Sequence, residues 1–430
     1  MVLRLDARAD DFETAFRALL GAKRETAEDV DATVRAILED VRANGDRALT
    51  SYTRRFDRFD PGTKGLQIPL AEARKAFETI ADDTRQALEF ARDRIRAHHR
   101  KQKPEDSRYT DEIGVELGSR WTAVEAAGLY VPGGTASYPS SVLMNAVPAR
   151  VAGVDRLVMV VPTPDDELNP LVLAAAHLAE VDEIYRVGGA QAIAALAYGT
   201  ETIRPVDKIV GPGNAFVATA KRQVFGTVGI DMIAGPSEVL VVADGANDPD
   251  WLAADLLAQA EHDVAAQSIL ITDDSGLADA VAGAVERHLQ TLNRAETARA
   301  SWTDYGAIIL VEALDDAIPL INRIAPEHLE LALDDAENML LSVRNAGAVF
   351  IGRHTPEVIG DYVGGSNHVL PTARSARFSS GLSVLDFMKR TSILKCNADN
   401  LALLAPSAIR LAKSEGLDAH ARSVSIRVNS

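Results

Sequence analysis

From about residue 123 onward, short apolar runs alternate with stretches that carry apolar residues at helical spacing. A strand followed by a helix and another strand is typical of βαβ units, whose strands lie parallel in one sheet. A first series has expected strands over 157–161, 183–187 and 208–210 and expected helices over 170–180, 190–198 and 215–224. A second has expected strands over 239–243, 268–272, 307–310 and 348–351 and expected helices over 250–260 and 276–292. The pattern therefore predicts two α/β units in tandem.

Helical patterns flank these two series. Apolar residues recur at helical spacing from Val30 to Val41, and we expect Gly45 to end that helix. Residues 70–103 predict further helix, with the adjacent His98 and His99 near its end. We expect this histidine pair to be solvated, because basic groups near a helix C-terminus interact favourably with the helix dipole. After Arg390 we expect helices over 397–404 and 406–415 and a strand-like tail over 423–428.

Charge and composition exclude several classes of function. The chain has 430 residues, which predicts more than one domain, and 45 basic against 62 acidic residues give a net charge of −17. A chain this acidic is a poor candidate for binding nucleic acid or an anionic membrane. Its one cysteine, Cys396, excludes an internal disulfide and a thiolate-rich zinc site and fits a reducing, cytoplasmic setting.

No membrane-spanning segment is expected. The longest uncharged window, 126–149, holds three prolines and a Gly-Gly pair, so we expect strand and loop there. The first residues contain no apolar run and carry an early acid, so we expect no signal peptide.

A carboxylate and an imidazole stand side by side at Glu327 and His328, directly after Pro326. Proline fixes its own φ and disfavours helix in the residue before it, so Pro326 predicts a sharp turn or the first turn of a helix. At a helix start both side chains can reach one cleft. The pair offers two proton acceptors of different basicity, which suits a reaction with two proton-transfer steps. The alternative is an ordinary helix with an acidic first turn.

Two other segments hold possible metal ligands. Gln259 and His262 are three residues apart at the end of an expected helix, so both project from one face. Asp361 and His368 lie in an expected glycine-rich loop, 360–368, where the backbone can approach a ligand closely. Solvated side chains at the helix end, and turn hydrogen bonds in the loop, are the alternatives.

A further carboxylate and imidazole, Glu415 and His420, lie at the end of the last expected helix and just after it. Gly416 predicts the end of that helix, so the two side chains would lie on an irregular segment. An exposed polar tail is the alternative.

Nucleotide-binding signals are weak. The chain has no G-x-G-x-x-G motif and no lysine-containing phosphate loop. Residues 188–191 (Gly-Gly-Ala-Gln) and 211–214 (Gly-Pro-Gly-Asn) each join an expected strand to an expected helix. A helix N-terminus at either place could hold a phosphate, and ordinary tight turns are the alternative.

Taken together, these segments resemble the histidinol dehydrogenase family along essentially the whole chain. The resemblance depends on the order and spacing of seven motifs: residues 128–134 (GLYVPGG), 211–217 (GPGNAFV), 234–239 (AGPSEV), 259–262 (QAEH), 325–330 (APEHLE), 364–368 (GGSNH) and 415–420 (EGLDAH).

The resemblance implies a pair of incomplete Rossmann-like, aldehyde-dehydrogenase-like α/β/α domains with helical extensions at both ends. In that arrangement 1–25 is the N-terminal extension, and 26–122 with 237–385 forms the domain that carries the metal ligands and the Glu-His pair. Residues 123–236 form the NAD-binding domain, and 386–430 is a C-terminal extension that reaches the partner subunit.

The resemblance also implies the roles of individual residues. Glu327 and His328 are the catalytic bases. The implied ligands of one Zn²⁺ per subunit are Gln259, His262, Asp361 and His420. The implied substrate contacts are Ser237, Gln259, His262, His328, Asp361, Glu415 and His420. The implied NAD⁺ contacts are Tyr130, Gln191 and Asn214.

The implied reaction is the oxidation of L-histidinol to L-histidinal and then to L-histidine with two NAD⁺, the last step of histidine biosynthesis. In the family the histidine that matches His328 removes the hydroxyl proton, and the glutamate that matches Glu327 activates the water that adds to the aldehyde. The C-terminal segment with Glu415 and His420 enters the neighbouring subunit, which implies a homodimer with shared active sites.

Two alternatives remain open. A relative that oxidises another polar alcohol, such as a sulfonated diol, would need Arg or Lys where this chain has Glu415, since a carboxylate suits an ammonium or an imidazole. A protein that uses zinc only for structure would have no use for the Glu327–His328 pair. Neither reading assigns a function to His98, His99 or His368.

Overall fold

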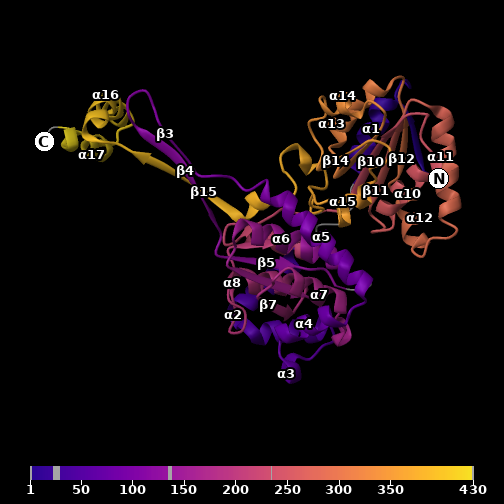
Figure 1. The fold of residues 1–430 in the computed structure, drawn as a ribbon, viewed down its shortest axis with the longest axis horizontal. Helices are drawn as coiled ribbons and strands as arrows, with labels where there is room; N and C mark the ends of the chain where they lie inside the picture. The colour runs from indigo at the N-terminus through magenta and orange to yellow at the C-terminus, as the bar shows by residue number, and fades with distance from the viewer. Residues whose placement is uncertain (1, 23–29, 134–137, 234, 429–430) are drawn as a thin grey trace.

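The computed structural model describes residues 2–22, 30–133, 138–233 and 235–428. Figure 1 shows two α/β units and a long arm that projects from them and carries the C-terminus. Each unit is built on a six-stranded sheet, here called sheet A and sheet B, and the arm on a three-stranded sheet, sheet C. The predicted fold class is therefore confirmed.

Sheet A is parallel throughout. Its strands in spatial order are β1 (Leu3–Asp6), β12 (Ala307–Leu310), β11 (Gln267–Thr272), β10 (Glu238–Ala243), β13 (His328–Ala332) and β14 (Ala348–Ile351). Its helices are α1 (Phe12–Gly21), α10 (Pro249–Ala260), α11 (Ser275–His288), α12 (Ala295–Asp304), α13 (Ala317–Ile324), α14 (Ala336–Leu340) and α15 (Glu357–Tyr362), with the 3₁₀ turn η2 (Leu314–Asp316). Alternate residues of β10 enter a core with α10–α12 on one face and a core with α1 and α13 on the other. Burial on both faces explains why these strands are continuous apolar runs in the sequence.

Sheet B is parallel except for its edge strand β2. Its strands in spatial order are β2 (Gln67–Ile68), β7 (Glu183–Arg186), β6 (Arg156–Val161), β5 (Ala126–Tyr130), β8 (Lys208–Val210) and β9 (Gly229–Ile230). Its helices are α2 (Val30–Phe56), α3 (Pro61–Lys64), α4 (Leu70–Thr79), α5 (Asp82–Arg100), α6 (Pro139–Ala152), α7 (Pro170–Leu178), α8 (Gly189–Tyr198) and α9 (Ala215–Val224), with the 3₁₀ turn η1 (Pro164–Asp166).

Helices α2, α4 and α5 pack on the helices of sheet B, with α2 against α8 and α9, α4 against α7, and α5 against α6. The predicted grouping of 26–122 with 237–385 is therefore wrong for these helices. The apolar face of α2, from Val34 to Val41, belongs to the same core as Val158 and Ile193. An amphipathic helix shows in its sequence that it covers a sheet, but it does not show which sheet.

The three strands of the arm come from two distant parts of the chain. Sheet C has the antiparallel order β15 (Met388–Lys395), β4 (Glu116–Ala123) and β3 (Ser107–Thr110). It leads to a hairpin of two helices, α16 (Ala398–Ser414) and α17 (Asp418–Val428), at the far end of the molecule (Figure 1). The remaining 3₁₀ turns, η3 (Ser375–Arg377) and η4 (Val384–Phe387), precede β15.

Several predicted elements are wrong, chiefly where proline was taken to exclude a helix. The window 126–149 contains β5 but continues into α6, with Pro139 in the first turn and Pro148 buried inside the helix. Helix α16 likewise runs through Pro406, and 423–428 belongs to α17. In α6, where the side chains around Pro148 are buried, packing offsets the one backbone hydrogen bond that the internal proline removes. Gly45, with φ of 52°, does interrupt α2 as predicted.

None of the helices in the described ranges is long and apolar enough to cross a membrane.

Candidate active site

Glu327 and His328 lie at the amino end of β13, beside the first residues of β10. Helix α13 ends at Ile324, Ala325 takes a left-handed conformation with φ of 49°, and the chain passes through Pro326 directly into the strand. The predicted helix start at this pair is therefore wrong. Proline restrains the backbone before it in a way that suits the start of a strand as well as that of a helix, so the local sequence did not distinguish the two.

The backbone of Glu238 fixes both side chains. The Glu238 N–H donates to Oε2 of Glu327 at 2.9 Å, and Nδ1 of His328 lies 2.9 Å from the Glu238 carbonyl oxygen. A carbonyl oxygen only accepts, so Nδ1 carries a hydrogen. The other ring nitrogen, Nε2, is buried, makes no hydrogen bond within the described residues, and lies 3.7 Å from Oδ1 of Asp361.

Burial shifts the pKa values of this pair. Desolvation raises the pKa of Glu327 to about 8, although the charge of His328 opposes the shift. Burial by itself would lower the pKa of His328, but the carboxylates of Glu357 and Glu327 raise it well above its usual value. Oε2 of Glu357 lies 3.5 Å from Nδ1 of His328, and Oε2 of Glu327 lies 3.7 Å from it. Perturbed titration of neighbouring buried groups is typical of a catalytic site.

Gln259 and His262 lie where α10 ends, next to this pair. Gln259 is 1% exposed, and neither its amide oxygen nor its amide nitrogen has a hydrogen-bond partner in the described part of the chain. His262 comes just after the helix, and its N–H donates to the Gln259 carbonyl oxygen at 3.2 Å. The surrounding protein lowers the pKa of His262, while Asp361 raises it. A buried amide without partners is costly, and a metal ion would satisfy its oxygen.

Asp361 lies near the end of the short helix α15, not in a loop as predicted. Burial raises its pKa, but the interaction with His328 and the nearby His368 and His262 lower it more, so the net shift is downward. Two of the groups predicted from the sequence, His262 and Asp361, therefore lie close to His328, and Gln259 lies one turn before His262 in the last turn of α10.

A second cluster with metal-binding geometry shares Asp361 with this set. Among the described residues, His328, Glu357 and Asp361 offer ligand atoms within 4.8 Å of one another. An ion on Nδ1 of His328 would displace the hydrogen bond to Glu238, and an ion on Nε2 would remove the free nitrogen of the predicted base. The predicted set of ligands does not include His328 and so leaves both of its ring nitrogens as they are.

Sequence reasoning missed a group of buried carboxyl groups behind His328. The Glu357 N–H donates to Oε1 of Glu330 at 2.6 Å, and Glu330 hydrogen-bonds the side chain of Asp255. Burial raises the pKa of Asp255 to about 6 and that of Glu357 to about 7. In the sequence, Glu357 resembles any acid in a first helical turn after a proline, so no local signal marked it.

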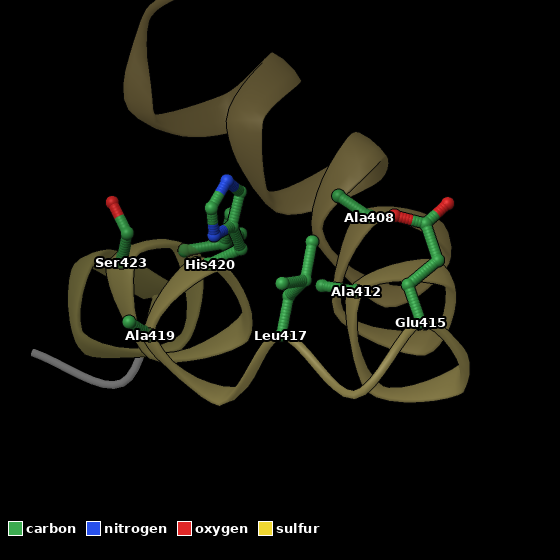
Figure 2. Close-up of a pocket in the computed structure, with 8 residues that line it drawn as sticks. Ala408, Ala412, Glu415, Leu417, Ala419, His420 and Ser423 are labelled. Atoms are coloured by element: carbon green, nitrogen blue, oxygen red, sulfur yellow. The ribbon is translucent and has the colours of Figure 1, made fainter.

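Glu415 and His420 lie elsewhere in this chain. Both are on the hairpin of α16 and α17, which Figure 1 places at the opposite end of the molecule from α10 and α15. His420 is in the first turns of α17, so the predicted irregular segment is a helix, although Gly416 ends α16 as predicted. The two side chains point to the same side of the hairpin and line a hollow of about 600 Å³ (Figure 2).

The three residues predicted to contact NAD⁺ lie at the carboxyl ends of strands in sheet B. Tyr130 ends β5, Gln191 is in the first turn of α8 after β7, and Asn214 caps α9 after β8. The Gly189 N–H donates to the Tyr130 hydroxyl at 3.1 Å, and burial raises the pKa of Tyr130 to about 12. The N-termini of α8 and α9 thus lie at one edge of a parallel sheet, where open α/β sheets bind their ligands.

Ser237 directly precedes β10 and Glu238, and its carbonyl oxygen accepts from the Gln267 N–H at 2.9 Å. It therefore lies at the same edge of sheet A as the Glu327–His328 pair.

The histidines without a predicted role have different surroundings. His368 lies beside Asp361, with 4.0 Å between Nδ1 and Oδ1, and its Nε2 is 3.4 Å from the hydroxyl oxygen of Ser141 in α6. His98 is exposed, whereas His99 is fully buried, so the prediction that both are solvated is wrong for His99. Nδ1 of His99 lies 2.8 Å from the Ile95 carbonyl oxygen, and burial lowers its pKa to about 4.

Two parallel-sheet units, with a buried Glu–His pair at the edge of one and two helix N-termini at the edge of the other, define the class of the protein as an α/β enzyme. Comparison with known proteins narrows this class. The sequence profile of the histidinol dehydrogenase family matches residues 21–428.

Relatives of known name agree over full length. The chain is 70% identical to the histidinol dehydrogenase of Mesorhizobium japonicum over 429 residues, with all of both chains covered. It is 68% identical to that of Brucella abortus, again with both chains fully covered. The crystal structure of histidinol dehydrogenase from Elizabethkingia anophelis is 35% identical, with a TM-score of 0.95 over 100% of this chain and 98% of that one.

The chain belongs to the histidinol dehydrogenase family. It is accordingly an NAD-dependent oxidoreductase of histidine biosynthesis.

Proposed function

We propose that this chain oxidises L-histidinol through L-histidinal to L-histidine with two NAD⁺ at one site built around Glu327 and His328. The observation that carries the proposal is the double contact of this pair with the backbone of Glu238, which holds a carboxylate and an imidazole at one sheet edge. Each oxidation passes a hydride to NAD⁺ and releases a proton from oxygen, so the reaction needs a base twice.

In the first oxidation His328 acts as the base. Its Nδ1 hydrogen is committed to Glu238, so Nε2 is the nitrogen that takes the hydroxyl proton of histidinol. The carbon that carries this hydroxyl gives its hydride to NAD⁺, and the C–O bond becomes the carbonyl of histidinal. The carboxylates of Glu357 and Glu327 stabilise the imidazolium that forms.

In the second half Glu327 acts first. As a carboxylate it takes a proton from water, whose oxygen adds to the aldehyde carbon to give a hydrate. His328 then takes a hydroxyl proton of the hydrate while the second NAD⁺ receives the hydride, which leaves the carboxyl group of histidine. Burial raises the pKa of Glu327 to about 8, so it acts as a stronger base than an ordinary carboxylate once the pH is high enough to ionise it.

The proposed metal ligands are Gln259, His262, Asp361 and a His420. A zinc ion there would bind the imidazole and amine of the substrate and so fix its position. The unpartnered amide of Gln259 supports this use, and N and O ligands are the only kinds that these side chains offer.

The fourth ligand cannot come from the same chain in this conformation, because the hairpin of α16 and α17 lies far from α10 (Figure 1). The partner subunit's His420 and the partner subunit's Glu415 complete the site in our proposal. The arm supports this arrangement, since it exposes apolar side chains that water alone would cover: Leu394, Leu403, Leu411, Leu417 and Ile426. Two chains that exchange arms form a homodimer with two shared sites.

We propose Tyr130, Gln191 and Asn214 as the NAD⁺ contacts and the cytoplasm as the location. The amide oxygen of Asn214 caps α9 by accepting from the Phe216 and Val217 N–H groups, so its NH₂ group faces outward as a donor. The net charge of −17 supports a protein that binds neither nucleic acid nor an anionic membrane.

A relative that oxidises a sulfonated diol is the second candidate, and Glu415 argues against it. A carboxylate would repel a sulfonate but suits the ammonium and imidazole of histidinol.

NAD⁺ reduction with L-histidinol, before and after removal and return of zinc, tests the proposal. We expect two NADH per histidinol, no reduction after chelation, and recovery with zinc. No reduction by a zinc-loaded protein would contradict the proposed substrate, and a panel of polar alcohols would then identify another.

A further inference from the structure

Sheet B contains a fully buried ion pair that the proposed mechanism does not use. Lys221 is on α9 and Asp231 follows β9, and their side chains are 2% and 0% exposed. Their charged ends form an ion pair. Removing two charges from water costs about as much as their attraction returns, so such a pair is weak support for stability by itself. The contacts of the pair with the rest of the protein are therefore more informative than its contribution to stability.

Both members of the pair hydrogen-bond the backbone of one residue, Gly211, and we call this arrangement the clasp. Nζ of Lys221 donates to the Gly211 carbonyl oxygen at 2.9 Å, and the Gly211 N–H donates to Oδ2 of Asp231 at 2.8 Å. Both hydrogen-bonding groups of Gly211 are thus engaged by one ion pair. Hydrogen bonds to charged groups are stronger than those between neutral groups, which makes this a firm restraint on the chain.

Gly211 is the first residue after β8, where the chain turns toward α9. Its φ of 110° is open to glycine but not to residues with a side chain, and a Cβ at this position would lie 2.2 Å from the Tyr130 carbonyl oxygen. Three residues later Asn214 caps α9. The clasp at Gly211 therefore sets both the contact with Tyr130 and the direction in which α9 begins.

We propose that Lys221 and Asp231 are positioning residues for NAD⁺, which hold Gly211 so that Asn214 and the N-terminus of α9 face the dinucleotide. The inference rests on the proposed NAD⁺ contacts. Lys221 itself is buried beneath the turn, so its charge acts on the backbone of the protein and not on the cofactor.

The decisive variant replaces the ion pair by apolar side chains, Lys221→Met with Asp231→Leu. Exchange of a buried pair for apolar residues of similar size is usually tolerated, so we expect the protein to fold. We expect the Kd and KM for NAD⁺ to rise on the order of tenfold, as the loss of one or two charged hydrogen bonds implies. The KM for histidinol and the kcat at saturating NAD⁺ stay within about twofold, because neither depends on this turn.

A matched control is the ion pair of Arg156 and Glu183, whose side chains are 16% and 15% exposed. It lies at the amino ends of β6 and β7 in the same sheet, away from the proposed cofactor edge. Arg156→Met with Glu183→Leu should leave the Kd for NAD⁺ unchanged. An unchanged Kd in the Lys221/Asp231 variant, or equal rises for both substrates, would overturn the inference.

Two further variants keep the outcome interpretable. If the double variant does not fold, Lys221→Met with Asp231→Asn leaves no unpaired buried charge, keeps an acceptor for the Gly211 N–H and removes the donor to its carbonyl oxygen, and its Kd for NAD⁺ decides in the same way. Asn214→Ser keeps a helix cap and removes only the amide, so it tests the NAD⁺ site itself. If NAD⁺ binding weakens in Asn214→Ser but stays unchanged in the Lys221/Asp231 variant, the positioning role of the ion pair is refuted and the NAD⁺ contact is not. Unchanged NAD⁺ binding in Asn214→Ser would refute the proposed contact.

Discussion

The carbonyl oxygen of Glu238 lies 2.9 Å from Nδ1 of His328, and Nε2 is the ring nitrogen left without a hydrogen bond among the described residues. The contact exists because β10 and β13 are parallel neighbours with Val239 paired to His328. Strand pairing thus fixes the position of the imidazole ring, and the Glu238 N–H fixes the adjacent Glu327 in the same way.

Replacing His328 by Gln should abolish most of the activity. Glutamine fills a similar volume but cannot accept the hydroxyl proton, and loss of a general base lowers the rate roughly 10²–10⁴-fold. We expect kcat for histidinol to fall by this amount while the KM changes little. Steady-state kinetics checks this, with the far-UV circular dichroism spectrum as the control for folding. NAD⁺ reduction at the wild-type rate would show that another group is the base.

Replacing Glu327 by Gln should separate the two oxidations. The first oxidation does not need an activated water, so histidinol still reduces NAD⁺, but hydration of the aldehyde fails. We expect the yield to fall from two NADH toward one per histidinol in a single turnover. In the wild type, oxidation of added histidinal should rise as the pH passes through about 8, because Glu327 becomes a carboxylate only above its raised pKa. A flat pH profile for this half-reaction would contradict the role.

Replacing Gln259 by Leu should release the metal. The amide of Gln259 is buried and has no hydrogen-bond partner among the described residues, which is why we propose it as a ligand of the ion. Leucine has a similar size and an apolar side chain, and its burial should preserve or increase the free energy of unfolding of the metal-free protein. Loss of one ligand should lower zinc affinity at least tenfold, on the order of what disturbing a metal site costs. Elemental analysis of zinc per chain after dialysis checks this without an activity assay, and full zinc retention would exclude Gln259 as a ligand.

Mixed dimers of two inactive variants should be active. In the proposed dimer each site takes Gln259 from one chain and His420 from the other. Co-expression of Gln259→Leu with His420→Ala then gives mixed dimers in which one site carries both substitutions and the other carries none. We expect purified mixed dimers to have about half of the wild-type activity. Mixed dimers as inactive as their parents would show that each site is built from a single chain.

His99 should make the protein sensitive to acid. Its pKa is about 4 in the folded protein, below the ordinary value of 6.5, so the unfolded chain binds the proton first. The free energy of unfolding therefore falls as the pH drops from 6.5 toward 4, by about 3 kcal/mol for this one group. Urea unfolding of the wild type and of His99→Gln across this range checks the slope. Equal slopes would mean that His99 is not held neutral by burial.

The sequence by itself determined the two series of strands and helices and most of their limits. It did so because strands buried on both faces must be apolar, and because helices such as α8 and α9 must alternate with them. The motifs around Gln259, Glu327 and His420 identified the family before any contact was known, and their order along the chain was specific although each was weak alone.

Only the tertiary structure decided what surrounds each of these motifs. Strand pairing between β10 and β13 placed Glu238 against His328, and it turned an expected helix start into a strand. Packing decided that α2, α4 and α5 cover sheet B, and it allowed α6 to continue through an internal proline. Nothing in the sequence indicated the ion pair that holds Gly211 or the carboxyl groups behind His328. A charged residue has the same letter in the sequence whether it is buried or exposed. Sequence records which side chains are available, whereas burial and neighbours, which set their pKa values and partners, depend on contacts between distant segments.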